Sequence, residues 1–164
     1  MAKASKESII KEELSLSLKI CDWVAKYSIY AAIFLIPIFF LPWTADVLDF
    51  NKQALLLLLV FISILGFLSK ILISGKFEIK KSVMHIVAGV LFLVYLLATL
   101  FSVYRYGSFW GQPQQVSESL LTLMCFLLFY FLVSNTFSKK EILTSAIVLC
   151  FSAMLAELIS IFQL

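Results

Sequence analysis

The sequence predicts an all-α, polytopic integral membrane protein, and three observations support that fold class. Of the 164 residues, 62% are hydrophobic and 14% are charged, which leaves too few polar side chains to cover a water-facing surface. The apolar residues form blocks of about 20, the length of helix that crosses a bilayer. Lysines gather before the first block and after every second one. We therefore expect about five transmembrane helices and a cytoplasmic N-terminus.

The N-terminal segment, residues 1–26, mixes lysines with acidic residues ahead of the first apolar block. Ile10, Leu14, Leu18 and Cys21 recur at helical spacing, which is typical of an amphipathic helix lying on a membrane surface. A frayed tail is the alternative interpretation of the same residues. We expect a cytoplasmic or interfacial segment here, and a transmembrane region over 27–164.

The transmembrane region divides into five apolar segments. The first, 27–43, contains Pro37 and Pro42, and a membrane helix tolerates proline where neighbouring groups satisfy the freed carbonyl. The others are 54–73, 83–103, 120–137 and 142–164. The last is still apolar where the sequence stops, and a carboxylate inside a bilayer is costly. We therefore expect these residues to be the N-terminal part of a longer membrane domain.

The distribution of positive charge predicts the orientation. Eleven of the thirteen lysines and arginines fall in the N-terminal segment or in the loops after the second and fourth apolar blocks. Only Lys52 and Arg105 fall on the opposite side. Short basic loops stay in the cytoplasm, so the segments 44–53 and 104–118 are expected to face outward. If these segments converge, Lys52 adds a second positive charge near Arg105.

The sequence contains neither the catalytic motifs typical of soluble enzymes nor metal-binding motifs. The three cysteines, Cys21, Cys125 and Cys150, are far apart and lie in or beside apolar segments, as small packing residues do. His85 is the single histidine and has no partner at a suitable spacing, so we expect a structural or interfacial role and no catalytic triad or metal centre. Glu157 lies deep in an apolar segment, which makes it a functional candidate. A hydrogen-bonded glutamate facing the bundle interior explains it equally well.

The stretch FSVYRYGSFWGQPQQ, which follows the third apolar block, is the candidate binding segment. Arg105 is permanently charged and can hold a phosphate or carboxylate through two parallel hydrogen bonds. Tyr104, Tyr106 and Trp110 flank it, and such rings both favour the membrane interface and stack on sugars. An outward site for a lipid with an anionic headgroup fits this pattern. Composition alone favours an ordinary aromatic belt.

Two stretches resemble segments of the O-antigen ligase and O-antigen polymerase-like family. DFNKQALLLLLV (49–60) is similar to the start of that family's second span. TLFSVYRYGSFWG (99–111) is similar to the loop after its third span. The order of spans and loops resembles the family over most of 27–137. Tyr104 is a departure, because members often carry an acidic residue at this point, and a role for an acid here is in doubt.

The resemblance implies a bacterial inner-membrane enzyme with more spans than these residues contain. Such an enzyme transfers a glycan from an undecaprenyl diphosphate carrier to a glycan, lipid or protein acceptor on the outer side of the membrane. It implies no cofactor, no metal and no nucleic acid. The family's catalytic histidine and arginines lie in a later loop, so catalytic residues are expected beyond Leu164 and this segment alone is expected to be inactive. The candidate substrate-binding residues here are Arg105, Tyr104, Tyr106, Trp110 and Lys52.

Two other functions stay open at this point. A transporter or flippase fragment would carry polar or charged residues within its spans and often an internal repeat. Glu157 is the one such residue, and the sequence has no convincing repeat. A non-enzymatic membrane scaffold is the other alternative, and it would be a complete short protein.

Overall fold

The computed structural model describes residues 2–39, 49–75, 80–111 and 118–162, with side chains from Glu13 onward except those of Asp49, Ser160 and Phe162. These residues are 90% helical and contain no strand. The helices are α1 (Ala2–Ile38), α2 (Asp49–Ser74), α3 (Val83–Leu100), α4 (Arg105–Trp110), α5 (Leu120–Thr136) and α6 (Lys139–Phe162). The all-helical class expected from the sequence is therefore confirmed.

Four of the helices are long and apolar enough to cross a membrane. The candidate spans are Glu13–Ile38, Phe50–Ser74, Val83–Leu100 and Lys139–Ile159. The remaining expected span, 120–137, forms α5, which has 17 residues and is about 25 Å long at 1.5 Å per residue. The number and length of the spans indicate a multi-pass membrane protein.

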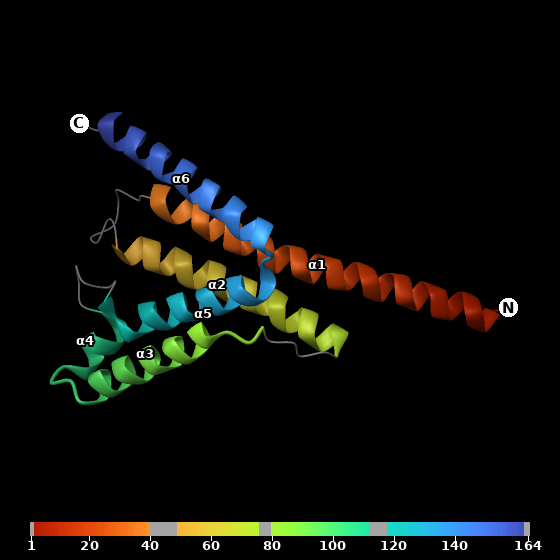
Figure 1. The fold of residues 1–164 in the computed structure, drawn as a ribbon, viewed down its shortest axis with the longest axis horizontal. Coiled ribbons are helices and arrows are strands. Elements are labelled where there is room, and N and C mark those ends of the chain that lie inside the picture. The colour runs from red at the N-terminus through yellow and green to blue at the C-terminus, as the bar shows by residue number, and fades with distance from the viewer. Residues whose placement is uncertain (1, 40–48, 76–79, 112–117, 163–164) are drawn as a thin grey trace.

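The long helices pack as neighbours in the order α6, α1, α2, α5 and α3, and α4 packs against α5 and α3. Figure 1 shows that long helices that follow one another along the chain run in opposite directions. The end of α1, the start of α2, the end of α3, the start of α5 and the whole of α4 consequently lie at one end of the bundle. The end of α2, the start of α3, the end of α5 and the start of α6 lie toward the other.

Helix α1 is continuous where the sequence suggests two elements. It runs from Ala2 to Ile38 without a break after Lys26, and its first part projects beyond the other helices (Figure 1). Pro37 lies in the last turn, where its missing N–H removes one intrahelical hydrogen bond, and the helix ends one residue later. Pro42 and Trp43 lie outside the described residues.

Small residues bring α1 and α2 into close contact. A Cβ added at Gly66 would lie 2.9 Å from the backbone nitrogen of Ala25 and 3.0 Å from the carbonyl oxygen of Cys21. Ser63, which is 1% exposed, donates a hydrogen bond of 3.0 Å to the carbonyl of Ala25. Membrane helices associate through such close packing because lipid tails are as apolar as their side chains. Glycine at position 66 is therefore required for this helix crossing.

An apolar core fills the space between α1, α2 and α5. Its buried members are Ile29, Leu56, Val60, Phe67, Cys125, Leu132 and Phe137. Ring contacts extend it, with centroids 4.9 Å apart for Tyr30 and Phe137 and 6.1 Å apart for Phe67 and Phe131. Cys125 is a free thiol within this core, which agrees with the packing role expected for it.

A chain of ion pairs joins three helices where α2 ends and α6 begins. Lys26 on α1 lies 2.8 Å from the carboxylate of Glu141 on α6 and 3.2 Å from that of Asp22. Asp22 in turn lies 2.5 Å from the ammonium group of Lys70 on α2. Partly exposed pairs of this kind each contribute up to about 1 kcal/mol, and a network holds several side chains in register. These ion pairs fix the positions of α2 and α6 along the axis of α1.

The two ends of the bundle differ in charge. The lysines on the side where α2 ends include Lys26, Lys70, Lys80, Lys81, Lys139 and Lys140. The cations at the other end, within the described ranges, are Lys52 at the start of α2 and Arg105 at the start of α4. The segregation that the order of segments predicts is therefore present in three dimensions.

We expect Gly66→Ala to lower the free energy of unfolding by about 1–3 kcal/mol, the usual cost of overpacking, because the new methyl group meets the backbone of Ala25. Gly89→Ala is the matched control, since a Cβ there meets no heavy atom within 4 Å. Unfolding in detergent micelles, followed by circular dichroism, measures both variants. Equal stability of the two variants would contradict the close α1–α2 contact.

Candidate functional site

The segment between α3 and α5 contains a short helix where the sequence suggests a loop. After α3 ends at Leu100, a turn leads into α4, which occupies Arg105–Trp110. Gly111 follows with a φ of 96°, a conformation that glycine adopts without steric cost. The hydroxyl of Ser108 donates to the hydroxyl of Ser102 over 2.7 Å and ties α4 back to the turn. The backbone path from the end of α3 into α4 is thereby held by one pair of serines.

A pocket of about 340 Å³ lies between α3, the turn, α4 and the start of α5. Its polar lining residues are Tyr95, Thr99, Ser102, Ser108, Glu118 and Ser119. Gly107, which is buried, also lines the pocket, so the backbone of α4 itself forms part of the wall. The pocket is therefore lined mainly by hydroxyl groups and one carboxylate.

The pocket hydroxyls are held by local hydrogen bonds and keep capacity for a ligand. The hydroxyl of Thr99 donates to the carbonyl of Tyr95 over 2.8 Å. The hydroxyl of Ser102 accepts from Ser108 over 2.7 Å and from the backbone N–H of Tyr104 over 3.3 Å. A hydroxyl group has one donor and two acceptor positions, so Thr99 keeps its acceptor positions and Ser102 keeps its O–H donor. The exposed carboxylate of Glu118 adds a strong acceptor. Such a lining suits a ligand that carries several hydroxyl groups.

A buried polar network supports the α5 side of the pocket. Gln53 on α2 donates from Nε2 to the hydroxyl of Thr122 over 2.7 Å and to that of Ser119 over 3.3 Å. Ser119 caps α5 by accepting from the backbone N–H of Thr122 over 3.2 Å. Because Ser119 also lines the pocket, Gln53 orients a pocket hydroxyl from the neighbouring helix.

Four of the five candidate substrate-binding residues lie on or beside α4. Tyr104, Arg105, Tyr106 and Trp110 are all exposed, and the described pocket lining does not include them. Arg105 lies three residues before Ser108, and residues at that spacing are neighbours on a helix surface. Arg105 is thus one helical turn from a residue that lines the pocket, and its side chain is exposed.

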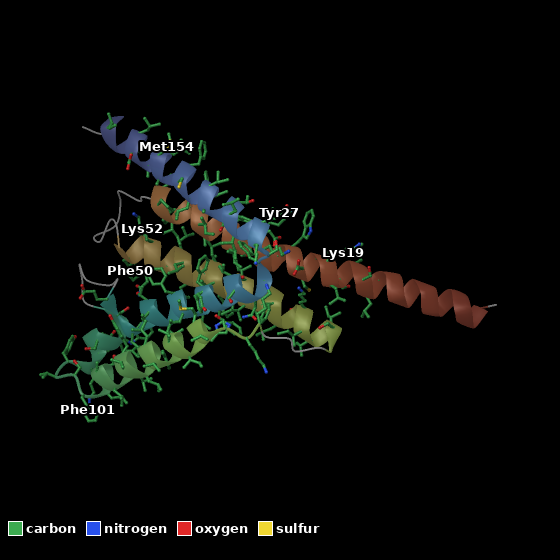
Figure 2. All side chains as sticks on the ribbon, viewed as in Figure 1. Lys19, Tyr27, Phe50, Lys52, Phe101 and Met154 are labelled. Atoms are coloured by element: carbon green, nitrogen blue, oxygen red, sulfur yellow. The ribbon has the colours of Figure 1, made fainter. Side chains whose placement is uncertain are left out.

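The fifth candidate, Lys52, lies at the same end of the bundle on a different helix. It is partly exposed in the first turn of α2 (Figure 2), and α5 separates α2 from α4 in the order of packing. The structure does not place Lys52 among the residues that line the pocket.

His85 and Glu157 occupy different surroundings. His85 is partly buried at the start of α3, where Nε2 donates to the carbonyl of Lys80 over 2.9 Å and the ring contacts Tyr130. Glu157 is exposed on α6 and does not face the bundle interior. Within the described ranges, no group of three or more histidine, cysteine or acidic side chains is arranged to hold a metal ion.

The candidate segment at 101–115 contains Ser102, Gly107 and Ser108 of the pocket, but no sequence pattern pairs them with the rest of its lining. Ser102 and Ser108 are six positions apart, a spacing that brings two side chains together only because a turn and a new helix separate them. Gln53 and Ser119 are 66 positions apart and meet through the packing of α2 on α5. The one available signal is Ser119 itself, since a serine directly before an apolar block is a typical helix cap.

Comparison with known proteins identifies no relative of this chain. No family model, curated protein or solved structure matches it. The ligand chemistry therefore follows from the pocket's own residues. Hydroxyl groups, one carboxylate and a guanidinium group one helical turn away together suit a ligand with hydroxyl groups and an adjoining anionic group.

We expect Gln53→Leu to destabilise the protein by about 1–2 kcal/mol, because two buried hydrogen bonds are lost at α5. The loss should be local, so the amide protons in the first turn of α5 should exchange faster with solvent than in the unmodified chain. Hydrogen exchange followed by mass spectrometry measures this change. Thr144→Val is a suitable control, since Thr144 is exposed and donates within its own helix. Unchanged exchange at α5 in Gln53→Leu would refute the supporting role.

Proposed function

We propose that these residues belong to a membrane enzyme that transfers an undecaprenyl-diphosphate-linked glycan to an acceptor, as in the O-antigen ligase and polymerase-like family. The observation that carries the proposal is the hydroxyl-lined pocket beside α4, with Arg105 one turn from its rim. A glycan offers many hydroxyl groups, and its carrier offers a diphosphate. The pocket residues and the arginine complement these two parts of one ligand.

The proposed orientation has the N-terminus in the cytoplasm and the α4 end on the outer side of the bacterial inner membrane. Its support is the charge difference between the two ends, because lysine-rich segments are retained on the cytoplasmic side during insertion. Lipid-linked glycans of this class are used on the outer side, so the orientation and the ligand agree with each other.

In the proposed reaction the chain positions the donor. The sugar next to the carrier occupies the pocket, where Ser102, Ser108 and Glu118 exchange hydrogen bonds with its hydroxyl groups. Arg105 holds the diphosphate, on which negative charge builds as the bond to the sugar breaks. A fixed cation at that point stabilises the transition state and improves the leaving group.

The aromatic residues complete the proposed binding surface. Tyr104, Tyr106 and Trp110 are exposed around α4, where rings can stack on sugar faces and also sit at the lipid headgroups. Tyr104 and Tyr106 have ring centroids 6.4 Å apart, so they form a joint surface beside Arg105. Lys52 would act at a distance, through its charge at the same end of the bundle.

Labelling of single cysteines tests the orientation. In a chain whose native cysteines are replaced by alanine, Tyr106→Cys should react with a membrane-impermeant maleimide in intact spheroplasts. Lys140→Cys, at the other end of the bundle, should react only after the membrane is permeabilised. The reverse pattern would exclude a role for Arg105 with an outward-facing donor.

Binding measurements in nanodiscs test the ligand. We expect Arg105→Gln to weaken binding of a glycan-bearing undecaprenyl diphosphate about tenfold or more, since one charge-assisted hydrogen bond is worth about 1.5–3 kcal/mol. Ser108→Ala should weaken binding of this ligand but not of undecaprenyl diphosphate that lacks the glycan, because Ser108 faces the sugar.

Lys140→Gln is the matched control, because it removes a positive charge at the opposite end and should leave the affinity for the glycan-bearing carrier unchanged. Microscale thermophoresis with a labelled protein gives the affinities. Equal affinities for Arg105→Gln and the unmodified chain would remove the arginine from the proposed site. A lack of saturable binding by the unmodified chain would count against the proposed ligand.

A further inference from the structure

A second concave surface lies between α3 and α5, apart from the α4 pocket. It is a groove of about 510 Å³ lined mainly by apolar side chains, among them Phe92, Met124, Leu128 and Phe131. Gly89 of α3 lies in its wall, and a Cβ added there would meet no heavy atom within 4 Å. The groove therefore has open space where a bulkier residue would project into it.

The groove has one polar end. His85 closes it, with its ring centroid 5.5 Å from that of Tyr130 and 5.9 Å from that of Phe131. The ring is held in place because Nε2 donates to the carbonyl of Lys80. The end of the groove toward the starts of α3 and α6 is thus bounded by an imidazole and a phenol, while its walls are apolar.

Two lysines, Lys80 and Lys81, lie next to this polar end, and two more follow the end of α5. Lys80 and Lys81 directly precede α3, and Lys139 and Lys140 begin α6 just after α5 ends. All four are exposed. The ammonium group of Lys80 donates to the carbonyl of Phe137 over 2.8 Å, which fixes one positive charge at the α5 side and leaves it two further N–H groups.

We propose that this groove binds one acyl chain of an anionic phospholipid, with the lipid phosphate held by the lysines at the His85 end. An apolar wall does not distinguish one lipid tail from another, because all tails are equally apolar. The headgroup provides the selection, since lysines near a membrane surface attract anionic lipids and not zwitterionic ones. The site lies at the end of the bundle opposite the α4 pocket and does not depend on the glycan proposal.

The apolar walls of the groove, with lysines at one end only, favour a lipid over a protein partner. The α3 helix has no buried residue within the described structure, so its apolar side chains face the hydrocarbon that surrounds a membrane helix. A groove in such a surface, open to the bilayer and bordered by cations at headgroup level, matches the shape of a lipid with one charged and one apolar end.

Native mass spectrometry of the detergent-purified chain tests the proposal. The chain is titrated with phosphatidylglycerol or with phosphatidylcholine of the same acyl composition. We expect saturable binding of the anionic lipid, about tenfold tighter than that of the zwitterionic lipid. Equal affinity for both lipids would show non-selective tail contact and would overturn the proposal.

Two sets of variants locate the site. Gly89→Phe should fill the groove and abolish saturable phosphatidylglycerol binding, whereas Gly89→Ala should retain it. Lys80→Gln combined with Lys81→Gln should remove the preference for the anionic lipid while leaving the weaker binding of phosphatidylcholine. Lys19→Gln removes the same kind of charge from α1, remote from the groove (Figure 2), and should retain the preference.

Three other outcomes of these experiments would contradict the proposed lipid site. If Gly89→Phe binds phosphatidylglycerol as the unmodified chain does, the lipid occupies another surface. If Lys19→Gln reduces the preference as much as the double lysine variant does, the charge effect is not local. A two-chain species that disappears in Gly89→Phe would assign the groove to a second copy of the chain instead. Circular dichroism of each variant confirms that a lost signal does not come from unfolding.

Discussion

The close contact between α1 and α2 is the constraint on which the rest of the structure depends. In a bilayer, helices gain little from burying apolar side chains against one another, so close backbone packing has to hold them together. Gly66 and Ser63 provide that packing against Ala25. The resulting pair carries α6 on its α1 side and α5 on its α2 side. A bulkier residue at position 66 would separate the pair and displace both flanking helices.

Polar contacts at the two ends of the bundle then set the position of each helix along the bundle axis. At one end, Lys26 links α1 to Glu141 of α6, and Asp22 links it to α2. At the other, Gln53 of α2 bonds to the capping serine of α5. Between these two ends the contacts between helices are mainly apolar. Such contacts determine the distance between two helices better than they determine which turns of the helices face each other. Hydrogen bonds and ion pairs are directional, so they decide which turns face each other.

The chemical character of the molecule also divides along the bundle axis. The α4 end combines hydroxyl groups, a carboxylate and one arginine, which suits the proposed glycan carrier. The opposite end presents lysines beside an apolar groove closed by His85, which suits the proposed anionic lipid. Both proposed ligands are lipids with a charged group at headgroup level, and the two proposed sites differ in what lies next to that charge.

The sequence alone determined the helical class, the apolar segments and the separation of charge, because each follows from local composition and the thickness of a bilayer. The segment expected at 83–103 lies at α3 (Val83–Leu100), and that expected at 120–137 lies at α5 (Leu120–Thr136). Only the tertiary structure decided the order of helix neighbours, the continuity of α1 through Lys26, the short helix α4, and the meeting of Gln53 with Ser119. The order of neighbours and the meeting of Gln53 with Ser119 depend on contacts between residues far apart in the chain, and no local periodicity records which helix face meets which neighbour.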